Sequence, residues 1–526
     1  MYKKLFIDSQ KAIFLLSFFF VLFANYTFFS KVFYFAHLEG NLLVTWSVPF
    51  VLFWIFVFIL NLLLVVTYKY SFKTVLILLV VISAVSSYFM NTFGTIIDKD
   101  MITNAIQTDA MEVLDLITLK FLLYLFGLGL IPIYWIYQQK IEYKKYPMEI
   151  LNKLLFIAIS LSIISLSYLV LSKNYSSFFR NHGEVRYYTT PTYPVYSLGR
   201  FFQVHFTTKK TITPIGLDAS HTTQAKKRLV VFVVGETARA ENFSLNGYPT
   251  KTNPNLESQN SIVSFSNFYS CGTATAVSVP CMFSKFGKEE YSDEKQYYEN
   301  IVDIVNRVGV KVLWRDNNSG GSKGVADRLQ DVQYFGGDVF DEVMLKDLQK
   351  NIDSSYKDTF VVLHQEGSHG PTYFKRYPDN FKKFTPTCDT QDLEKCTQEQ
   401  IVNTYNNTIA YTDFFLNETV KLLEKNEEKY ETLMVYVSDH GESLGENGIY
   451  LHGLPYMLAP DSQKHVPAIF WFGKDFQKEK MELATKKDAP FSHDNLFHTI
   501  LGAFHIKTNE YKVELDILQL KKEIRL

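Results

Sequence analysis

The stretch RLVVFVVGETARAENFSLNGY (residues 228–248) decides the fold of the second half of the chain. It is an unbroken apolar run that ends at a glycine and continues into charged and polar residues. Such runs are typical of strands in a parallel sheet, because helices cover both faces of these sheets. The stretch therefore predicts a buried strand whose carboxyl end opens onto polar residues.

Four later stretches of the chain are similar apolar runs. The runs are VGVKVLWRD (308–316), TFVVLHQEGSHG (359–370), ETLMVYVSDHGES (431–443) and HVPAIFWFG (465–473). Helical patterns intervene, for instance over residues 401–426. Strands that alternate with helices predict an α/β domain with a mostly parallel central sheet, which we assign to residues 228–526.

The first third of the chain has a different pattern. Uncharged apolar stretches occupy residues 12–30, 42–66, 74–93, 121–137 and 154–171. Each is close to the ~20 residues that a helix needs to cross a bilayer. The first lacks a small-residue cleavage site, so we expect a retained helix and not a signal peptide. We predict a membrane domain of five transmembrane α-helices over residues 1–172, joined by a bridging, interfacial segment over 173–227.

The lysines in the short loops predict the orientation of these helices. One set of loops carries nine lysines (Lys3, Lys4, Lys11, Lys69, Lys73, Lys140, Lys144, Lys145, Lys153) and the opposite set carries three (Lys31, Lys99, Lys120). Positive residues favour the cytoplasmic side. We therefore expect a cytoplasmic N-terminus and, after five crossings, a second domain that lies outside the cytoplasm.

Composition excludes several classes of protein. The 526 residues carry a net charge of −1, which excludes a nucleic-acid binder that acts through bulk positive charge. A hydrophobic content of 47% excludes a disordered chain. The four cysteines form two close pairs, Cys271 with Cys281 and Cys388 with Cys396, and predict two disulfides in an oxidising compartment.

Potential metal ligands follow two of the apolar runs. Glu236 follows the first run, and Asp439 and His440 follow the run that starts at residue 431. In parallel sheets, ligands bind at the carboxyl ends of the strands. Carboxylate and imidazole together suit Zn²⁺ or Mn²⁺. The alternative is that each residue is a solvated strand end.

The segment SCGTATAVSVPCMFS (270–284) is a candidate nucleophile loop. It offers the hydroxyls of Thr273, Thr275 and Ser278 inside the loop that a Cys271–Cys281 bridge would close. Hydroxyls and backbone N–H groups at a helix start can present a nucleophile and hold an anion. A structural Ser/Thr turn is the alternative, and composition does not choose between Thr273 and Thr275.

Further candidates lie in glycine-containing loops and on one predicted helix. His369 and His452 lie in the loops EGSHGP and YLHGLP, and WRDNNSGGSKG (314–324) supplies Ser319 and Lys323, a lysine that suits a phosphate. Asn104, Thr108 and Glu112 have the spacing of one helix face. We interpret that face as a polar ledge for a lipid head group at the membrane boundary, or as an ordinary solvated face.

The motifs GETARAENFSLNGY, SCGTATAVSVPCMFS, WRDNNSGGSKG, SHGP and SDHGESLGENGIYLHG, in this order, resemble those of the bacterial phosphoethanolamine transferases that modify lipid A. This family includes the colistin-resistance enzymes and falls within the alkaline phosphatase and sulfatase-like superfamily. The resemblance covers essentially the whole chain, and it implies a bacterial inner-membrane protein whose catalytic domain is periplasmic.

The resemblance also implies roles for individual residues. Glu236, Thr275, Asp439 and His440 would bind one Zn²⁺, with Thr275 as the nucleophile that accepts the phosphoryl group. Ser319, Lys323, His369 and His452 would hold the phosphate of phosphoethanolamine or a second zinc ion, and His369 or His452 would protonate the leaving oxygen. Asn104, Thr108 and Glu112 match the family's positions on the ethanolamine side.

The function that the resemblance implies is transfer of phosphoethanolamine from phosphatidylethanolamine to lipid A or lipooligosaccharide, which lowers polymyxin binding. We expect a monomer with no nucleic-acid partner. The alternatives are a phosphoethanolamine or phosphoglycerol transferase with another envelope acceptor, a hydrolase that hands the group to water, and a non-catalytic envelope protein. The hydrolases of the formylglycine sulfatase kind require a Cys-x-Pro-x-Arg motif, which this sequence lacks.

Overall fold

The computed structural model describes residues 6–65, 69–108, 110–207, 211–222, 224–292, 297–336, 339–354 and 356–518. The chain divides into two compact units. Unit 1 contains Met1–Lys99 and Ile117–Phe201, and unit 2 contains Asp100–Leu116 and Phe202–Leu526. The loop between the predicted third and fourth membrane helices therefore belongs to the same compact unit as the predicted catalytic domain.

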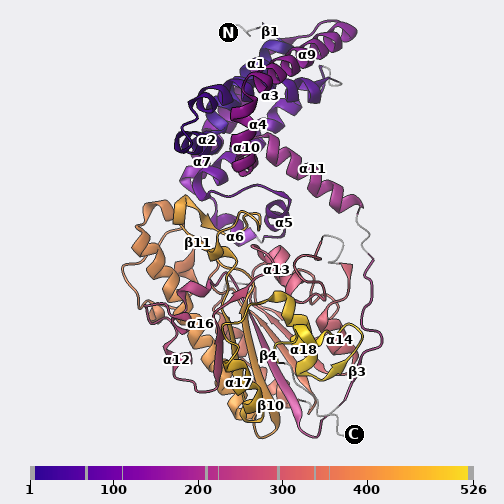
Figure 1. The fold of residues 1–526 in the computed structure, drawn as a ribbon, viewed down its shortest axis with the longest axis vertical. Coiled ribbons are helices and arrows are strands. Elements are labelled where there is room, and N and C mark those ends of the chain that lie inside the picture. Colours follow the sequence, from indigo (N-terminus) through magenta and orange to yellow (C-terminus); the bar gives the residue numbers. More distant parts are fainter. Residues whose placement is uncertain are drawn as a thin grey trace. The chain divides into compact units, whose positions relative to one another are not determined.

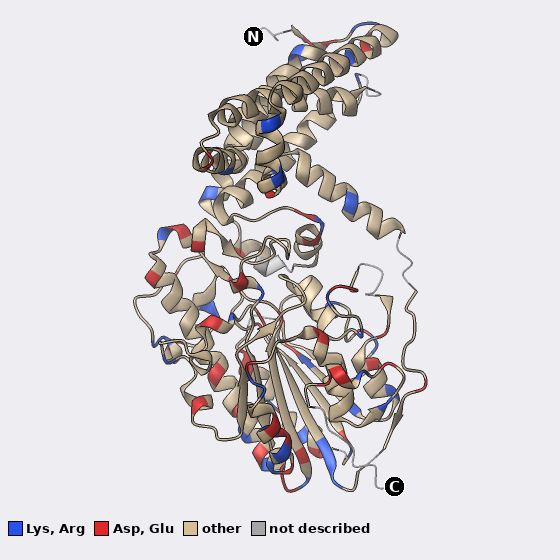
Figure 2. Cartoon of the chain, viewed as in Figure 1, with Lys and Arg blue, Asp and Glu red and all other residues tan. Residues whose placement is uncertain are grey.

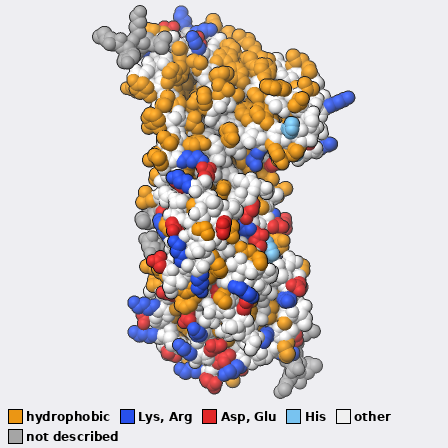
Figure 3. All heavy atoms as spheres, turned by 90° about the vertical axis from the view of Figure 1, so that its left-hand side faces the viewer, with side chains coloured by type: hydrophobic (Ala, Val, Ile, Leu, Met, Phe, Trp, Pro, Cys, Tyr) orange, Lys and Arg blue, Asp and Glu red, His pale blue; other side chains and the backbone are white. Residues whose placement is uncertain are grey.

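Unit 1 is helical, and its helices are almost free of charge along their length (Figure 2). Among the described residues, four helical segments are long and apolar enough to cross a membrane: α3 (Leu42–Leu64), α4 (Phe72–Phe93), Leu119–Gln138 and α9 (Tyr146–Val170). The third of these runs through α7 (Leu119–Tyr124), a π-helical part and α8 (Ile131–Gln138). Figure 3 shows hydrophobic side chains gathered over the surface of this unit, as expected for a membrane-embedded domain.

The first predicted span is bent. Helix α1 (Ser9–Phe19), with its π-helical continuation Phe20–Ala24, meets α2 (Tyr26–Leu38) at an angle of 65°. Asn25 lies at the break, where its amide donates to the carbonyls of Phe20 and Thr190 at 2.9 and 2.7 Å. The pair gives five spans if it counts as one crossing, so the prediction of an apolar helical domain is confirmed with four or five candidate spans.

The segment after α9 is mostly helical. Helix α10 (Ser172–Asn181), the 3₁₀ turn Gly183–Tyr188 and α11 (Thr192–Thr207) follow one another before the chain reaches the first strand of the sheet. The sequence showed no sustained period here, because short helices interrupted by turns produce none.

Unit 2 is built on a seven-stranded sheet with the order β5-β13-β10-β4-β9-β7-β8 (Figure 1). The strands are β4 (Lys227–Gly235), β5 (Ile262–Phe265), β7 (Lys311–Asp316), β8 (Val332–Tyr334), β9 (Thr359–His364), β10 (Tyr430–Ser438) and β13 (Ala468–Phe472). The pairs from β10 through β4, β9 and β7 to β8 are parallel. The predicted α/β fold with a mostly parallel sheet is therefore confirmed.

Strand β13 departs from the expected direction. It pairs antiparallel with β10 and with β5. A parallel neighbour needs a crossover, usually a helix on one face of the sheet. The chain between β10 and β13 instead contains only the short strands β11 (Ser443–Leu444) and β12 (Tyr450–Leu451) and 3₁₀ turns, so it returns along the adjacent strand in the opposite direction.

Helices bury both faces of the sheet. Val230, Phe232 and Val234 of β4 pack in one cluster with α13 (Thr275–Met282), α14 (Ile301–Arg307) and α18 (Leu496–Ala503). The alternate residues of β4 pack on the other face with α12 (Pro254–Glu257), α15 (Leu348–Asp353) and α16 (Gln398–Asn426). Burial on both faces explains why the strands have continuous apolar sequences instead of alternating ones.

Candidate metal centre

The register between two central strands brings the candidate ligands together. Strands β4 and β10 are parallel, with Gly235 opposite Ser438. Glu236 directly follows β4, and Asp439 and His440 directly follow β10, so the three residues lie at the same edge of the sheet. All three side chains are buried. One ligand atom from each lies within 4.8 Å of the others. The arrangement of two carboxylates and one imidazole could hold a metal ion.

Thr275 completes this cluster as the first residue of α13. Its Oγ lies 3.3 and 3.2 Å from the two carboxylate oxygens of Glu236 and 3.2 Å from His440 Nε2. Thr273 is oriented differently, because its hydroxyl donates to the carbonyl of Leu454 at 2.6 Å. Of the two threonines, it is Thr275 whose hydroxyl faces the carboxylates and the imidazole.

The charges in the cluster are strongly coupled. Burial alone would raise the pKa of Glu236, but the hydrogen bond and charge of His440 hold it well below its usual range. Burial and then the Glu236 carboxylate raise the pKa of Asp439 to about 7. Burial disfavours the charged form of His440, yet the two carboxylates outweigh it and raise its pKa to about 9. Two buried carboxylates this close favour a cation between them.

Two atoms of the cluster, Asp439 Oδ2 and His440 Nε2, are placed where they could bind a metal ion. Asp439 Oδ2 is buried and has no hydrogen-bond donor among the described residues. His440 Nδ1 lies 2.9 Å from the carbonyl of Gly441, so Nδ1 carries a hydrogen and Nε2 faces the cluster, where a bound metal would take the place of its proton. An orphaned carboxylate oxygen and a fixed imidazole tautomer fit a divalent cation such as zinc.

A second layer of polar groups orients Glu236 and Asp439. The Thr237 hydroxyl donates to Glu236 Oε1, and the Asn318 amide donates to Glu236 Oε2 at 2.9 Å. Asp439 Oδ1 accepts the N–H of Thr237 at 3.2 Å and that of His440 at 2.7 Å. Thr237 and Asn318 were not predicted, although Asn318 follows strand β7 as Glu236 follows β4, which was a usable signal.

His369 and His452 lie beside the cluster. The ring centroid of His452 is 4.2 Å from that of His440 and 5.6 Å from that of His369. Glu442 accepts from His452 Nδ1 at 2.9 Å and from the Tyr373 hydroxyl at 2.5 Å. Burial, together with the charge of His440, lowers the pKa of His452. Glu442 was not predicted, although it belongs to the same SDHGES motif.

The glycine-rich loop after β7 holds the other two predicted side chains. The Ser319 N–H donates to Glu366 Oε2 at 2.9 Å, and Glu366 Oε1 pairs with Arg376 at 2.9 Å. Burial raises the pKa of Glu366 to about 6 despite this arginine. Lys323 has a φ of +50° and donates to the carbonyl of Gln107 at 3.4 Å. The loop therefore contacts the segment that contains Asn104 and Thr108.

That segment does not form the single helix face that the spacing predicts. Helix α5 (Lys99–Gln107) ends before Thr108, and α6 (Ala110–Asp115) starts a new helix. The Thr108 hydroxyl donates to the carbonyl of Asn104 at 2.8 Å, a local side-chain bond that competes with helix continuation. The side chain of Glu112 lies outside the described residues.

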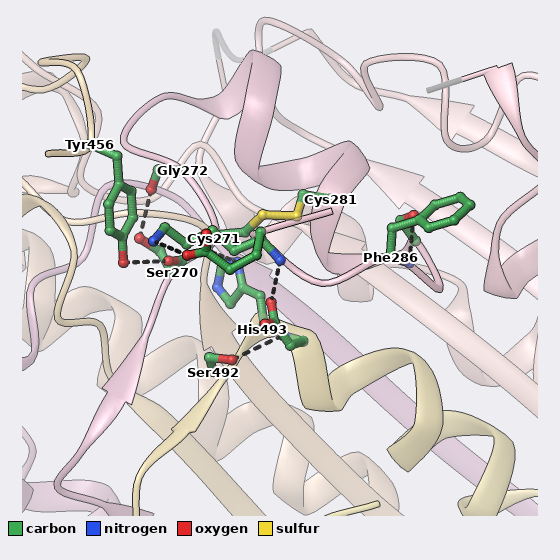
Figure 4. Close-up of a disulfide and its surroundings, with 12 residues drawn as sticks. Ser270, Cys271, Gly272, Cys281, Phe286, Tyr456, Ser492 and His493 are labelled. Atoms are coloured by element: carbon green, nitrogen blue, oxygen red, sulfur yellow. Dashed lines mark hydrogen bonds and ion pairs between the residues drawn. A yellow bond between two sulfur atoms is a disulfide. The ribbon is translucent and has the colours of Figure 1, made fainter. Parts of the chain in front are cut away.

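Both predicted disulfides are present, Cys271–Cys281 and Cys388–Cys396. Figure 4 shows the first one beside His493, whose ring links two parts of the site. His493 Nδ1 accepts the N–H of Cys271 at 3.1 Å, and Nε2–H donates to the carbonyl of Ser438 at 3.0 Å. This buried histidine thereby joins the loop that carries Thr275 to the end of β10, and burial lowers its pKa to about 3.

Comparisons with known proteins match both halves of the chain. The family profile described as Sulfatase matches residues 228–506, and the profile described as Phosphoethanolamine transferase EptA/EptB matches residues 55–206. The first profile covers the sheet and the candidate metal centre, and the second covers most of the predicted membrane helices.

Individual relatives align along nearly the full length. The phosphoethanolamine transferase EptA of Escherichia coli (strain K12) is 41% identical over 525 residues, which cover 95% of this chain and 94% of the relative. The phosphatidylethanolamine transferase Mcr-1 of Escherichia coli is 40% identical over 514 residues, covering 93% of each.

A solved structure of a relative also has the same fold as this chain. The lipooligosaccharide phosphoethanolamine transferase A (EptA) from Neisseria meningitidis is 35% identical, with a TM-score of 0.92, over 98% of this chain and 99% of that chain. Because the likeness covers the apolar helices as well as the sheet, the chain belongs to the phosphoethanolamine transferase family, enzymes with a membrane domain and a sulfatase-like catalytic domain.

Proposed function

We propose that this protein transfers phosphoethanolamine from phosphatidylethanolamine to lipid A or lipooligosaccharide through a covalent phosphoethanolamine–Thr275 intermediate. The observation that carries the proposal is the position of Thr275 Oγ, which lies 3.2–3.3 Å from Glu236 and His440. Relatives named for phosphatidylethanolamine and for lipooligosaccharide support the donor and the acceptor.

We further propose that Glu236, Thr275, Asp439 and His440 hold one zinc ion, with His369 and His452 as candidates for a second. When bound, zinc would stabilise negative charge on phosphoryl oxygens and lower the pKa of a nearby hydroxyl. The orphaned Asp439 Oδ2 and the orientation of His440, with Nδ1 on the Gly441 carbonyl and Nε2 toward the cluster, support this assignment.

In the first half of the reaction, Thr275 Oγ forms a bond to the phosphorus of the donor lipid, and the bond from phosphorus to the diacylglycerol oxygen breaks. The proton that Thr275 loses passes to the Glu236 carboxylate, whose oxygens lie 3.3 and 3.2 Å from Oγ, and it returns to Oγ in the second half of the reaction. His369 or His452 supplies a proton to the leaving diacylglycerol oxygen. The position of His452, 4.2 Å from His440 between ring centroids, supports this role.

In the second half, a phosphate or hydroxyl oxygen of the acceptor attacks the same phosphorus, and the bond to Thr275 Oγ breaks. Ser319 and Lys323 would hold the phosphate, and Asn104, Thr108 and Glu112 would face the ethanolamine. The 3.4 Å contact between Lys323 and the carbonyl of Gln107 supports a shared pocket for these groups. Transfer of a cationic group onto lipid A would lower the binding of cationic polymyxins.

We place the protein in the bacterial inner membrane with its N-terminus in the cytoplasm and unit 2 in the periplasm. The lysine count supports this orientation. The grouping of Asp100–Leu116 with the catalytic domain in one compact unit agrees with two crossings between them, since both would then lie on the same side of the membrane. Two disulfides in unit 2 suit the oxidising periplasm.

Peptide mapping tests the covalent step. Phosphatidylethanolamine incubated with the wild-type enzyme and no acceptor should leave a phosphoethanolamine adduct on Thr275, detected by mass spectrometry of the peptide that contains residues 271–281. Adding lipid A should remove the adduct and yield modified lipid A. An adduct on Thr273 or Ser278 would overturn the assignment of the nucleophile.

The acceptor requires a separate measurement. Mass spectrometry of lipid A and of envelope proteins, in cells with and without the gene, should show a phosphoethanolamine group on lipid A that depends on the gene. A group on another envelope acceptor, or a phosphoglycerol group in its place, would favour the alternative transferases. Absence of stoichiometric metal and of any adduct would favour a non-catalytic envelope protein.

A further inference from the structure

A cavity of about 630 Å³ lies within unit 1, where α1 and α9 begin. The two-stranded parallel pair of β1 (Phe6–Asp8) and β2 (Lys140–Glu142) contributes to its rim. The labels β1, α1 and α9 lie together at this end of the unit in Figure 1. All of its lining residues belong to unit 1, so the cavity is separate from the metal centre of unit 2.

One of the side chains that line the cavity has an unsatisfied polar atom. Gln10 is 5% exposed, and its amide donates to Asn61 Oδ1 at 2.8 Å, but its Oε1 has no hydrogen-bond partner among the described residues. The neighbouring buried carboxylate of Glu149 is already satisfied by the Ser9 hydroxyl and the N–H of Lys144. A buried acceptor without a donor is costly, so a ligand that donates a hydrogen bond to Gln10 would stabilise the site.

The rim carries charges of both signs. Asp8 and Glu142 are partners in the β1–β2 register, and both line the cavity. Like charges on paired positions destabilise a sheet, and a cationic group between them would relieve this repulsion. Lys11 and Lys144 line the same cavity and supply positive charge for an anion. The rim is therefore complementary to a zwitterion with a cationic and an anionic end.

An aromatic wall continues from this charged rim. The ring of Phe14 lies 5.9 Å from that of Phe53 and 5.3 Å from that of Phe156, between centroids. Leu15 and Phe18 line the cavity and are 42% and 54% exposed. A small soluble zwitterion would leave this apolar surface uncovered, whereas an acyl chain would cover it.

We propose that this cavity binds an aminophospholipid. Asp8, Glu142 and Gln10 Oε1 take its ammonium group, Lys11 and Lys144 take its phosphate, and the acyl chain lies along the phenylalanine wall. The site is distinct from the donor site proposed for unit 2, because every residue that lines the cavity belongs to unit 1. Its existence does not depend on the reaction proposed for unit 2.

Native mass spectrometry of the full-length protein in detergent tests the proposal. The Thr275→Ala variant serves as the background in every arm, so that the lipid is not consumed. The probes are phosphatidylethanolamine, phosphatidylglycerol with the same acyl chains, and free phosphoethanolamine. We expect retention of phosphatidylethanolamine at least tenfold above phosphatidylglycerol, and no competition by free phosphoethanolamine at equal concentration.

Two neighbouring lysines provide a matched pair of variants. Lys144→Glu, at the rim, should lower phosphatidylethanolamine retention at least tenfold, whereas Lys145→Glu, which has the same charge change but does not line the cavity, should leave it unchanged. Lys11→Glu, on a different element, should repeat the loss. Equal retention of the two lipids, displacement by free phosphoethanolamine, or equal behaviour of the two Lys→Glu variants at 144 and 145 would overturn the proposal.

Discussion

Thr273 and Thr275 have the same side chain and lie two residues apart, yet their hydroxyls have different partners. One donates to a backbone carbonyl, and the other faces Glu236 and His440. Residue type and spacing carry no information about this choice, because it depends on where α13 begins relative to the ends of β4 and β10. The sequence motif limits the candidate nucleophiles to one loop, and the contacts in the structure favour Thr275 among these candidates.

Substitution of Thr275 and substitution of the other three proposed ligands should affect turnover and metal binding differently. Thr275→Ala should lower turnover by roughly 10³-fold or more, the scale seen when a nucleophile is removed, while keeping most of the bound zinc through the three remaining ligands. Glu236→Ala, Asp439→Ala and His440→Ala should lose both zinc and turnover. Turnover assays paired with metal analysis of each purified variant provide the measurement. Full turnover by Thr275→Ala would contradict the covalent route.

His493 predicts a pH dependence of stability. Its folded-state pKa of about 3 lies below the ordinary value of 6.5, so between these values the unfolded chain binds a proton that the folded protein does not. Stability from this group is therefore fully present above pH 6.5 and decreases as the pH falls toward 3, by about 1.4 kcal/mol per pH unit. Thermal melts of the wild type and of His493→Gln from pH 7.5 to 5 should show the steeper loss in the wild type.

The other titrating groups are the same in the wild type and in His493→Gln. The difference between their melting temperatures at each pH therefore reports on His493 alone. Parallel loss of melting temperature in the two proteins would contradict the assignment. No feature of the local sequence FSHDN indicates this role. The partners of His493 lie 222 and 55 positions away in the chain, which places the contact beyond any local pattern.

At the scale of helices and strands, the sequence predicted those elements whose hydrophobic pattern alone determines the structure. Continuous apolar runs gave the buried strands, and the residues that follow them met at one sheet edge because β4 and β10 are parallel and in register. The patterns did not indicate the two places where a helix is interrupted. Asn25, which bonds to Thr190, lies at the bend of the first span, and Thr108, which bonds to Asn104, follows the end of α5. Neither contact changes the hydrophobic pattern.

The carboxylate of Asp115, the last residue of α6, bonds to the loop that follows β9. Asp115 accepts from Lys375 at 2.5 Å and from the Thr372 hydroxyl at 3.1 Å. Asp115→Ala should free the α5–α6 segment, which contains Asn104 and Thr108, and so increase hydrogen–deuterium exchange over residues 100–116 at least severalfold. The exchange of the central sheet should stay unchanged, because this contact lies at the surface of the unit.

Lys382→Met serves as the control, since it breaks an exposed ion pair with Asp389 elsewhere in unit 2. That variant should leave the exchange of residues 100–116 at the wild-type level. Equal exchange in the Asp115→Ala protein and in the wild type would show that other contacts hold the segment.

At the scale of the whole molecule, the proposed membrane orientation determines the compartment in which unit 2 lies. A reporter that is active only outside the cytoplasm should be active when fused after residue 175 and silent when fused near residue 145. The physical reason is the excess of lysines, nine against three, on the loops assigned to the cytoplasm. The reverse pattern would contradict both the orientation and the periplasmic location of unit 2.

The distance along the chain between the metal ligands has a consequence for biosynthesis. Thr237, which follows Glu236, and Asp439 bond to each other across 202 positions. In a chain exported as proposed, Glu236 would emerge long before Asp439 and His440, and no partial chain that ends ahead of β10 contains all the proposed ligands. The proposed site would therefore form only after β4 and β10 have paired. This order would tie the choice of metal to the ions present in the compartment where folding finishes.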